Sequence, residues 1–393
     1  MLSILAIAAA LQVQSVPNCQ SLALRDFICS QNQYGVVLGD DQAMTDHFGR
    51  VMREGEGRFR THFGREPTPY AVLVGDRVNP VSEGGVTGAD ARLQAELKAV
   101  GAQHVLPWFT AEQRGRLATA AARRGAEARA RREGLTGDAL ASEVDRILET
   151  APPIMASKDQ DSAAAHELGH MWTVAAFWPD RAGRAGGHYG GPAADWFDES
   201  SAVLMEDEVM AAERRDSFRQ QWSRSGGTRP KPLPDYFVDA HPLAGRDIRT
   251  SAGTPAAGAP PPGLRRQGGI IVRAEDLPPG AIIQRSEPSG EVSSPAPGQT
   301  FSISVASSAA FNSDAERDAA SMFYSQARVL ADFLFDRTRD PGVYGRIAAA
   351  LARGETMEQW LSSSGPQLGL GATAAELEEQ WRSWLTRTYG AIG

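Results

Sequence analysis

The 393-residue sequence predicts an α+β fold in which a small sheet is followed by a helical C-terminal domain. Two short apolar segments in the N-terminal half, Tyr70–Gly75 and Val105–Phe109, have the length and composition of buried strands. From residue 312 onward, apolar residues recur at helical spacing behind recognisable N-cap residues. We therefore expect an N-terminal α/β region, a central core, an irregular insert and a helical domain, at residues 19–150, 151–222, 223–311 and 312–393.

The N-terminal region contains signals for three helices around these strands. Met44–Phe63 mixes apolar and charged residues at helical spacing and precedes the first strand. Thr110 is followed three residues later by Gln113, a capping-box pattern that predicts a helix start. A further helix is predicted from an apolar stripe formed by Leu140, Val144, Ile147 and Leu148.

The helix predicted after Thr110 is rich in arginine. It carries Arg114, Arg116, Arg123, Arg124, Arg129, Arg131 and Arg132. Such a helix either binds a polyanion, such as nucleic acid or anionic lipid, or presents a solvated face, and the solvated face is favoured. The net charge of −8 offers no overall positive field for phosphates, so we expect no nucleic-acid partner.

The N-terminus has the features of an export signal. Leu2–Leu11 is an apolar run too short to span a bilayer but suited to a signal-peptide core, which we place at residues 1–18. The alternative is a buried N-terminal helix or strand. No other segment approaches membrane length, so we expect a secreted or periplasmic protein without stable membrane insertion. Cys19 and Cys29 then either form a disulfide or, in a cytosolic protein, remain two free thiols.

The central region is predicted to hold a strand and two helices. Pro152–Ala156 is short and extended, and the next helix starts near Asp161 or Ser162 and ends at Trp178, before Pro179. A glycine-rich loop at Gly183–Gly191 follows. Asp195 is then predicted to cap a helix that runs from Trp196 to about Arg215.

Residues 223–311 contain too little apolar surface to order well, apart from one strand-like patch at Gly269–Val272. Ordered structure is expected again from Ser313, which forms a capping box with Glu316 and opens a helix to about Arg337. Two more helices are predicted, one from Pro341 to Gly354 and one capped by Thr373.

The segment Ala165-His-Glu-Leu-Gly-His170 carries the strongest chemical signal in the chain. Residues four apart lie on one face of a helix, so His166 and His170 can direct ring nitrogens at a single metal ion. Glu167 lies beside that ion, where a carboxylate can take a proton from water activated by Zn²⁺. The alternative is a pair of core histidines satisfied by other partners.

A catalytic zinc takes three protein ligands and leaves a fourth position for water. Candidates for the third ligand are His188, Asp195, Asp198, Glu199, Glu206 and Glu208. The segment Asp195-Trp-Phe-Asp-Glu-Ser-Ser-Ala202 resembles the Trp-Leu/Phe-x-Glu-Gly-x-Ala pattern of gluzincins, the aminopeptidase N-like and peptidase-MA-like zinc enzymes. The resemblance implies that Glu199 is the third ligand and that the fold is zincin-like, with residues 151–222 as its catalytic core.

Other assignments of the third ligand remain. His188, in a glycine-rich loop, is the rival to Glu199. A metzincin pattern fails because its glycine and third histidine would fall on Thr173 and Ala176.

Peptide hydrolysis also requires a donor to the oxygen of the attacked carbonyl. Met322–Leu334 resembles the gluzincin helix that carries a tyrosine for this purpose, and the matching residue is Tyr324. Tyr324 is otherwise a packed aromatic on an amphipathic helix. His241 is the alternative donor, because thermolysin-like enzymes use a histidine in this role.

These features together predict zinc-dependent hydrolysis of protein or peptide substrates. The Gly-x-Met-Glu-Asn element with which aminopeptidase N-like enzymes bind a free amino terminus does not occur before His166. Internal cleavage is therefore expected. The alternative is a zincin-fold binding module without catalytic activity.

Overall fold

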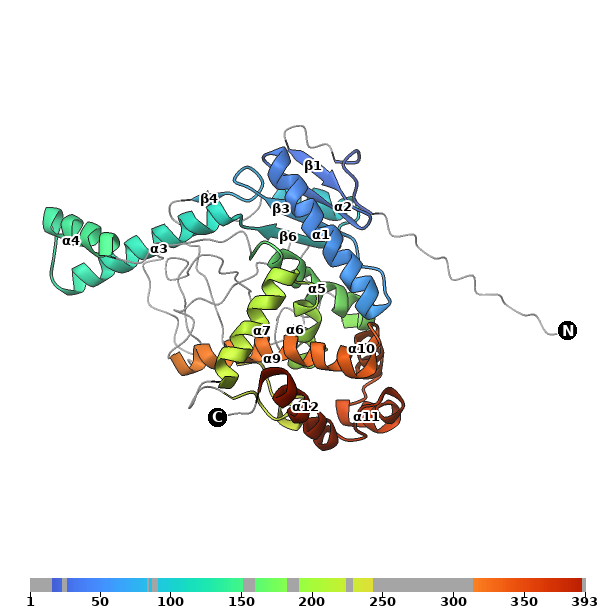
Figure 1. The fold of residues 1–393 in the computed structure, drawn as a ribbon. Helices are drawn as coiled ribbons and strands as arrows, with labels where there is room; N and C mark the ends of the chain where they lie inside the picture. Colours follow the sequence, from blue (N-terminus) through green and yellow to red (C-terminus); the bar gives the residue numbers. More distant parts are fainter. Residues whose placement is uncertain are drawn as a thin grey trace, which may run out of the picture.

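The computed structural model describes residues 16–22, 27–82, 85–86, 91–150, 160–181, 191–223, 229–242 and 314–390. The described chain is an α+β protein with one four-stranded sheet and many helices (Figure 1). The strands are β1 (Ile28–Gln31), β2 (Gly35–Gly39), β3 (Tyr70–Val74), β4 (Val81–Ser82), β5 (Gly85–Val86) and β6 (His104–Trp108).

Helices before residue 224 are α1 (Gln42–Phe63), α2 (Ala91–Ala99), α3 (Ala111–Arg132), α4 (Gly137–Thr150), α5 (Ala163–Phe177), η2 (Pro179–Arg181), α6 (Asp195–Val203) and α7 (Glu208–Ser223). Those after it are α8 (Leu233–Tyr236), α9 (Asp314–Thr338), α10 (Val343–Ala352), α11 (Met357–Ser364), η5 (Pro366–Leu368) and α12 (Ala374–Tyr389).

The main sheet has the strand order β1-β2-β3-β6. Strand β1 pairs antiparallel with β2, whereas β2, β3 and β6 are parallel and align Val37 with Val72 and Val72 with Leu106. Because side chains alternate along a strand, these three residues share one face, which packs on α1 and α5 in the main core. The opposite face packs on α2, so the sheet is covered on both sides.

A disulfide fastens the N-terminal segment to the sheet. The structure joins Cys19 to Cys29 of β1, with their Cα atoms 5.8 Å apart. Of the two alternatives that the sequence left open, the chain adopts the disulfide. Both cysteines pack with Leu22 and Phe27 against the α2 face of the sheet.

Helices α9 to α12 form the C-terminal part of the molecule, as predicted from residues 312–393 (Figure 1). Thr373 caps α12 by accepting a hydrogen bond from the backbone of Glu376. One hydrophobic core runs from the sheet, at Val37, through α5 and α6 to Leu385 of α12. The segment from His166 to His170 on α5 is therefore held between the sheet and the C-terminal helices.

The single helix predicted from Trp196 to Arg215 is wrong. The chain forms α6 and α7 instead, separated by a turn. Asp207 ends the turn by accepting a hydrogen bond from the backbone of Met210, at 2.9 Å, and so starts α7. Ala194 rather than Asp195 occupies the N-cap of α6.

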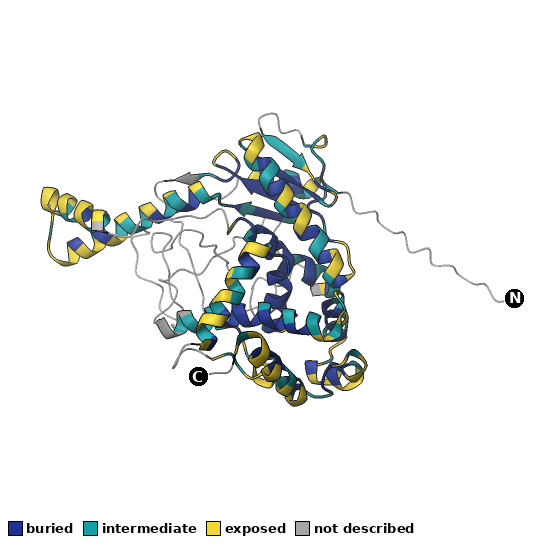
Figure 2. Cartoon of the chain, viewed as in Figure 1, coloured by how far each residue is buried: buried dark blue, intermediate teal, exposed yellow. Residues whose placement is uncertain are grey.

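Helices α3 and α4 pack on each other and project from the body as a largely exposed arm (Figures 1 and 2). The capping box of Thr110 and Gln113 starts α3, as predicted. Most of its arginines are exposed, as predicted for a solvated face, whereas Arg124 is half-buried. Arg114, at the base of the arm, is buried and pairs with Asp161 at 3.0 Å.

Strands β1 and β2 were not predicted, although the apolar run of β2 is typical of a buried strand. Helices α2 and α11 were also missed. The predicted signal core Leu2–Leu11, the strand at Pro152–Ala156, the loop with His188 and the patch at Gly269–Val272 lie outside the described residues. Within the described part of the chain, no helix is both long and apolar enough to cross a bilayer.

Candidate metal centre

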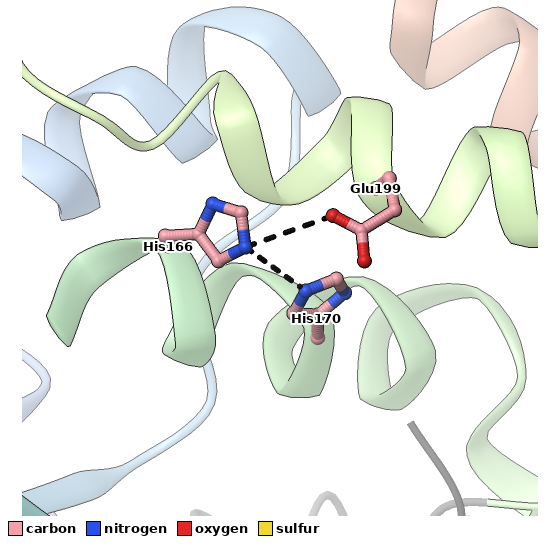
Figure 3. Close-up of side chains that lie close together, drawn as sticks. All are labelled: His166, His170 and Glu199. Atoms are coloured by element: carbon pink, nitrogen blue, oxygen red, sulfur yellow. Dashed lines mark hydrogen bonds and ion pairs between the residues drawn. The ribbon is translucent and has the colours of Figure 1, made fainter. Parts of the chain in front are cut away.

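Helices α5 and α6 bring three potential metal ligands together (Figure 3). His166 and His170 project from α5, and their Nε2 atoms lie 3.3 Å apart. Glu199 of α6 places Oε2 at 3.8 Å from Nε2 of His166. The ligand atoms of all three buried residues lie within 4.8 Å of one another. The convergence predicted from the sequence is confirmed, and the group could hold a metal ion.

The helix pair can approach closely because position 169 has no side chain. A Cβ atom on Gly169 would lie 2.7 Å from Cγ of Met205 and 3.1 Å from Cα of Ala202. On the other sides of α5, Leu168 and Trp172 are completely buried in the main core. Packing thus fixes the position of α5, and Gly169 lets α6 come near enough to deliver Glu199.

Each histidine has a carboxylate beside its outer nitrogen. Nδ1 of His170 lies 2.9 Å from Oδ1 of Asp198, and Nδ1 of His166 lies 2.9 Å from Oε1 of Glu206. A proton on Nδ1 in each case leaves the Nε2 lone pair directed into the ligand group. The sequence did not identify these two partners, although both residues stood among its candidate ligands.

Glu206 is itself held by Arg214. The guanidinium places Nη2 at 2.8 Å from Oε1 and Nε at 3.3 Å from Oε2 of Glu206. Burial raises the pKa of Glu206, but the charge of Arg214 and the hydrogen bond with His166 outweigh it and lower the pKa to about 2. Burial alone would lower the pKa of His166, whereas Glu206 and the nearby carboxylates raise it. Glu206 therefore remains ionised and raises the basicity of His166.

Glu167 follows the first histidine on α5 and is buried. Its negative charge contributes to the raised pKa of His166. The structure thus buries Glu167 on the same helix as the two histidines.

Of the two candidate donors to a carbonyl oxygen, His241 lies beside Glu199, and Tyr324 packs on His241. Nε2 of His241 is 3.9 Å from Oε1 of Glu199. The ring of Tyr324 packs edge-on to His241, with centroids 5.2 Å apart. The guanidinium carbon of Arg214 lies over the Tyr324 ring, 5.0 Å from its centroid. The tyrosine is thus linked through Arg214 to Glu206.

The remaining candidate ligands have other roles or positions. Asp195 accepts a hydrogen bond from the backbone N–H of His241, at 2.8 Å. Glu208 is exposed and pairs with Arg215. His188 lies outside the described residues. Among the residues that the structure describes, the metal-ligand group consists of His166, His170 and Glu199.

Comparison of the chain with protein-family models, with curated proteins and with solved structures gives no match. The chemistry of the centre therefore has to be inferred from the chain's own residues and their geometry.

Proposed function

We propose that this protein is a zinc metallopeptidase of the gluzincin type, with a zincin-like fold, that cleaves internal bonds of protein or peptide substrates. The observation that carries the proposal is the buried group of His166, His170 and Glu199, with an ionisable Glu167 on the same helix. Two imidazoles and one carboxylate are the ligand set of several catalytic zinc sites.

The residues present fit a zinc ion. Imidazole nitrogen and carboxylate oxygen suit zinc better than calcium or magnesium, which prefer oxygen ligands. The carboxylates of Asp198 and Glu206 hold both histidines by their outer nitrogens, as metal-binding histidines are commonly held. Three ligands in the described group also correspond to the number that catalytic zinc sites use.

A zinc ion, when bound, supplies a Lewis acid that polarises a carbonyl oxygen and lowers the pKa of water. Glu167 takes the proton from the attacking water and returns it to the leaving amine. Tyr324 donates its hydroxyl to the carbonyl oxygen as negative charge develops there. Arg214 and His241, packed on two sides of Tyr324, keep its ring in place.

Export through a signal peptide at residues 1–18 is part of the proposal. The disulfide between Cys19 and Cys29 supports it, because disulfides persist in oxidising compartments and are rare in the cytosol.

Glu167→Gln tests the mechanism. On residues 19–393, we expect about one zinc per chain in both forms and chelator-sensitive cleavage of an unfolded protein by the wild type. The variant should lose at least about 100-fold in rate because it has no base, while keeping its zinc. His170→Ala should lose the zinc itself.

Full activity in Glu167→Gln would contradict the assigned base. Zinc bound without cleavage by the wild type would favour the catalytically silent binding module. A wild-type chain that binds no zinc would refute the metal centre.

A further inference from the structure

The two oxygens of Glu199 face different neighbours. Oε2 lies 3.8 Å from Nε2 of His166, within the ligand group. Oε1 lies 3.9 Å from Nε2 of His241, which comes from the segment after α8. Both Glu199 and the side chain of His241 are almost completely buried. The carboxylate therefore has one oxygen within the ligand group and one directed to a histidine.

The position of His241 is fixed from two directions. Its backbone N–H donates to Oδ2 of Asp195, the first residue of α6, at 2.8 Å. Its ring packs edge-on to Phe323 and Tyr324 of α9, with centroids 4.7 and 5.2 Å apart. Since α6 also carries Glu199, His241 is tied to the helix whose ligand it faces.

The other two ligands each have an outer partner, Asp198 for His170 and Glu206 for His166. Those partners are carboxylates because the outer nitrogen of a metal-binding histidine donates a hydrogen bond. An anionic ligand needs the opposite, a donor on its second oxygen. A neutral histidine with a proton on Nε2 provides that donor in a buried site.

We propose that His241 is a positioning residue that donates from Nε2 to Oε1 of Glu199 and holds this carboxylate in its metal-binding orientation. The proposal rests on the proposed metal centre and deepens it. The separation of 3.9 Å exceeds a hydrogen bond by about 1 Å, so the carboxylate has to turn toward His241 for the bond to form. His241 then acts on the ligand, and Tyr324 is left to act on the substrate.

Zinc affinity, measured by competition with a chromophoric chelator, tests this role without any assay of hydrolysis. In His241→Gln the amide nitrogen takes the place of Nε2, so we expect affinity within about threefold of wild type. In His241→Asn the shorter amide cannot reach Oε1, and His241→Phe keeps the packing but has no donor. Both should bind zinc about 10- to 100-fold more weakly, as for other outer partners of metal ligands.

His62→Phe is the matched control, because His62 also stacks on an aromatic ring, that of Phe335, with centroids 4.9 Å apart. Its zinc affinity should equal that of the wild type. In a Glu199→Ala background, His241→Asn should cause no further loss, since the carboxylate on which it acts is gone.

Wild-type zinc affinity in both His241→Asn and His241→Phe would overturn the proposal. If those variants also lost kcat, His241 would act on the substrate, as in thermolysin-like enzymes. Failure of the proposed peptidase function has a different signature: no variant cleaves protein, yet the order of zinc affinities among the His241 variants is as expected.

Discussion

Glu206 lies in the turn between α6 and α7 rather than in a helix, and this location determines what its carboxylate contacts. The turn brings it to Nδ1 of His166, while Arg214, a turn and a half into α7, reaches back to pair with it. A buried carboxylate needs such pairing, because an isolated buried charge is costly. The same residue thus orients a metal ligand and keeps that ligand basic.

Glu206→Gln should weaken zinc binding about 10- to 100-fold. The amide can still accept from His166, but it loses the charge that raises the basicity of the ring and leaves Arg214 without its ionic partner. Chelator competition measures the change. The control is Glu208→Gln, which alters an exposed carboxylate two residues away and should leave zinc affinity unchanged.

His104, at the start of edge strand β6, provides a pH-dependent contribution to stability. Burial, and secondarily the charge of Lys98, lowers its pKa from 6.5 to about 4. The hydroxyl of Thr68 lies 2.8 Å from Nε2, within hydrogen-bond distance of the ring. The folded protein holds His104 neutral, whereas the unfolded chain takes up a proton near pH 6.5. The contribution of His104 to the free energy of unfolding is therefore fully present above pH 6.5 and is lost as the pH falls toward 4.

Between pH 7 and pH 5, the free energy of unfolding of the wild type should fall by about 1–2 kcal/mol more than that of His104→Gln. Denaturant unfolding of the two chains at both pH values, each with chelator present, measures the difference. Parallel pH dependence in the two chains would show that His104 titrates normally in the folded state.

At the scale of elements, the contact between α5 and α6 decides whether the three ligands meet. Helical spacing along α5 brings His166 and His170 together, but Glu199 joins them only if α6 packs close to α5. Gly169 faces the backbone of α6 at Ala202. Helix α1 packs on α5 as well, and there Gly55 faces Ala165. Small residues thus allow both α1 and α6 to lie close to α5.

Gly169→Ala should destabilise the protein by about 1–3 kcal/mol, because the added methyl group would overlap Met205 and press on the backbone at Ala202. It should also weaken zinc binding, since α6 and Glu199 are displaced. Thermal unfolding and chelator competition measure the two effects. Gly57→Ala is the control: no atom lies within 4 Å of its added Cβ, so it should raise stability by about 0.5–1 kcal/mol.

The arm of α3 and α4 has a small core of its own, formed by Ala126, Ala130 and Val144. Several of its arginines pair with acids along and across the two helices, as in the pairs of Arg123 with Asp145 and Arg131 with Glu127. Such pairing supports a solvated surface rather than a binding surface for nucleic acid.

For the molecule as a whole, a buried ion pair attaches the arm to the start of helix α5. Arg114 of α3 donates to Asp161, which lies just before α5, and to the backbone oxygen of Phe109. His47 of α1 lies 3.1 Å from the other oxygen of Asp161. Three segments that are far apart in the sequence therefore meet at one carboxylate beside the start of α5.

Arg114→Met should lower the free energy of unfolding by about 3–5 kcal/mol, because the buried carboxylate of Asp161 loses its arginine partner. The control is Arg116→Met, which removes an exposed pair with Asp76 and should cost less than about 1 kcal/mol. Equal effects of the two substitutions would mean that the buried pair contributes no more than a surface one. Denaturant unfolding distinguishes these outcomes.

Local signals in the sequence determined much of the fold and part of the centre. Helix α1, strands β3 and β6, and the start of α3 and α12 follow from periodicity and capping, which act between residues a few positions apart. The same short range made His166 and His170 predictable as a pair. Glu199 was predicted from a local sequence pattern, and the structure places it beside them.

Only the tertiary structure decided which groups surround those ligands. Glu206 meets His166 across 40 positions of sequence, and Arg114 meets Asp161 across 47. No periodic pattern connects such residues, because their contact depends on how α5 packs against α6 and how α3 leaves the sheet. The break between α6 and α7 was missed for the same reason. Helix propensity alone would continue the helix through residues 204–207, whereas the packing that places Glu206 at His166 interrupts it.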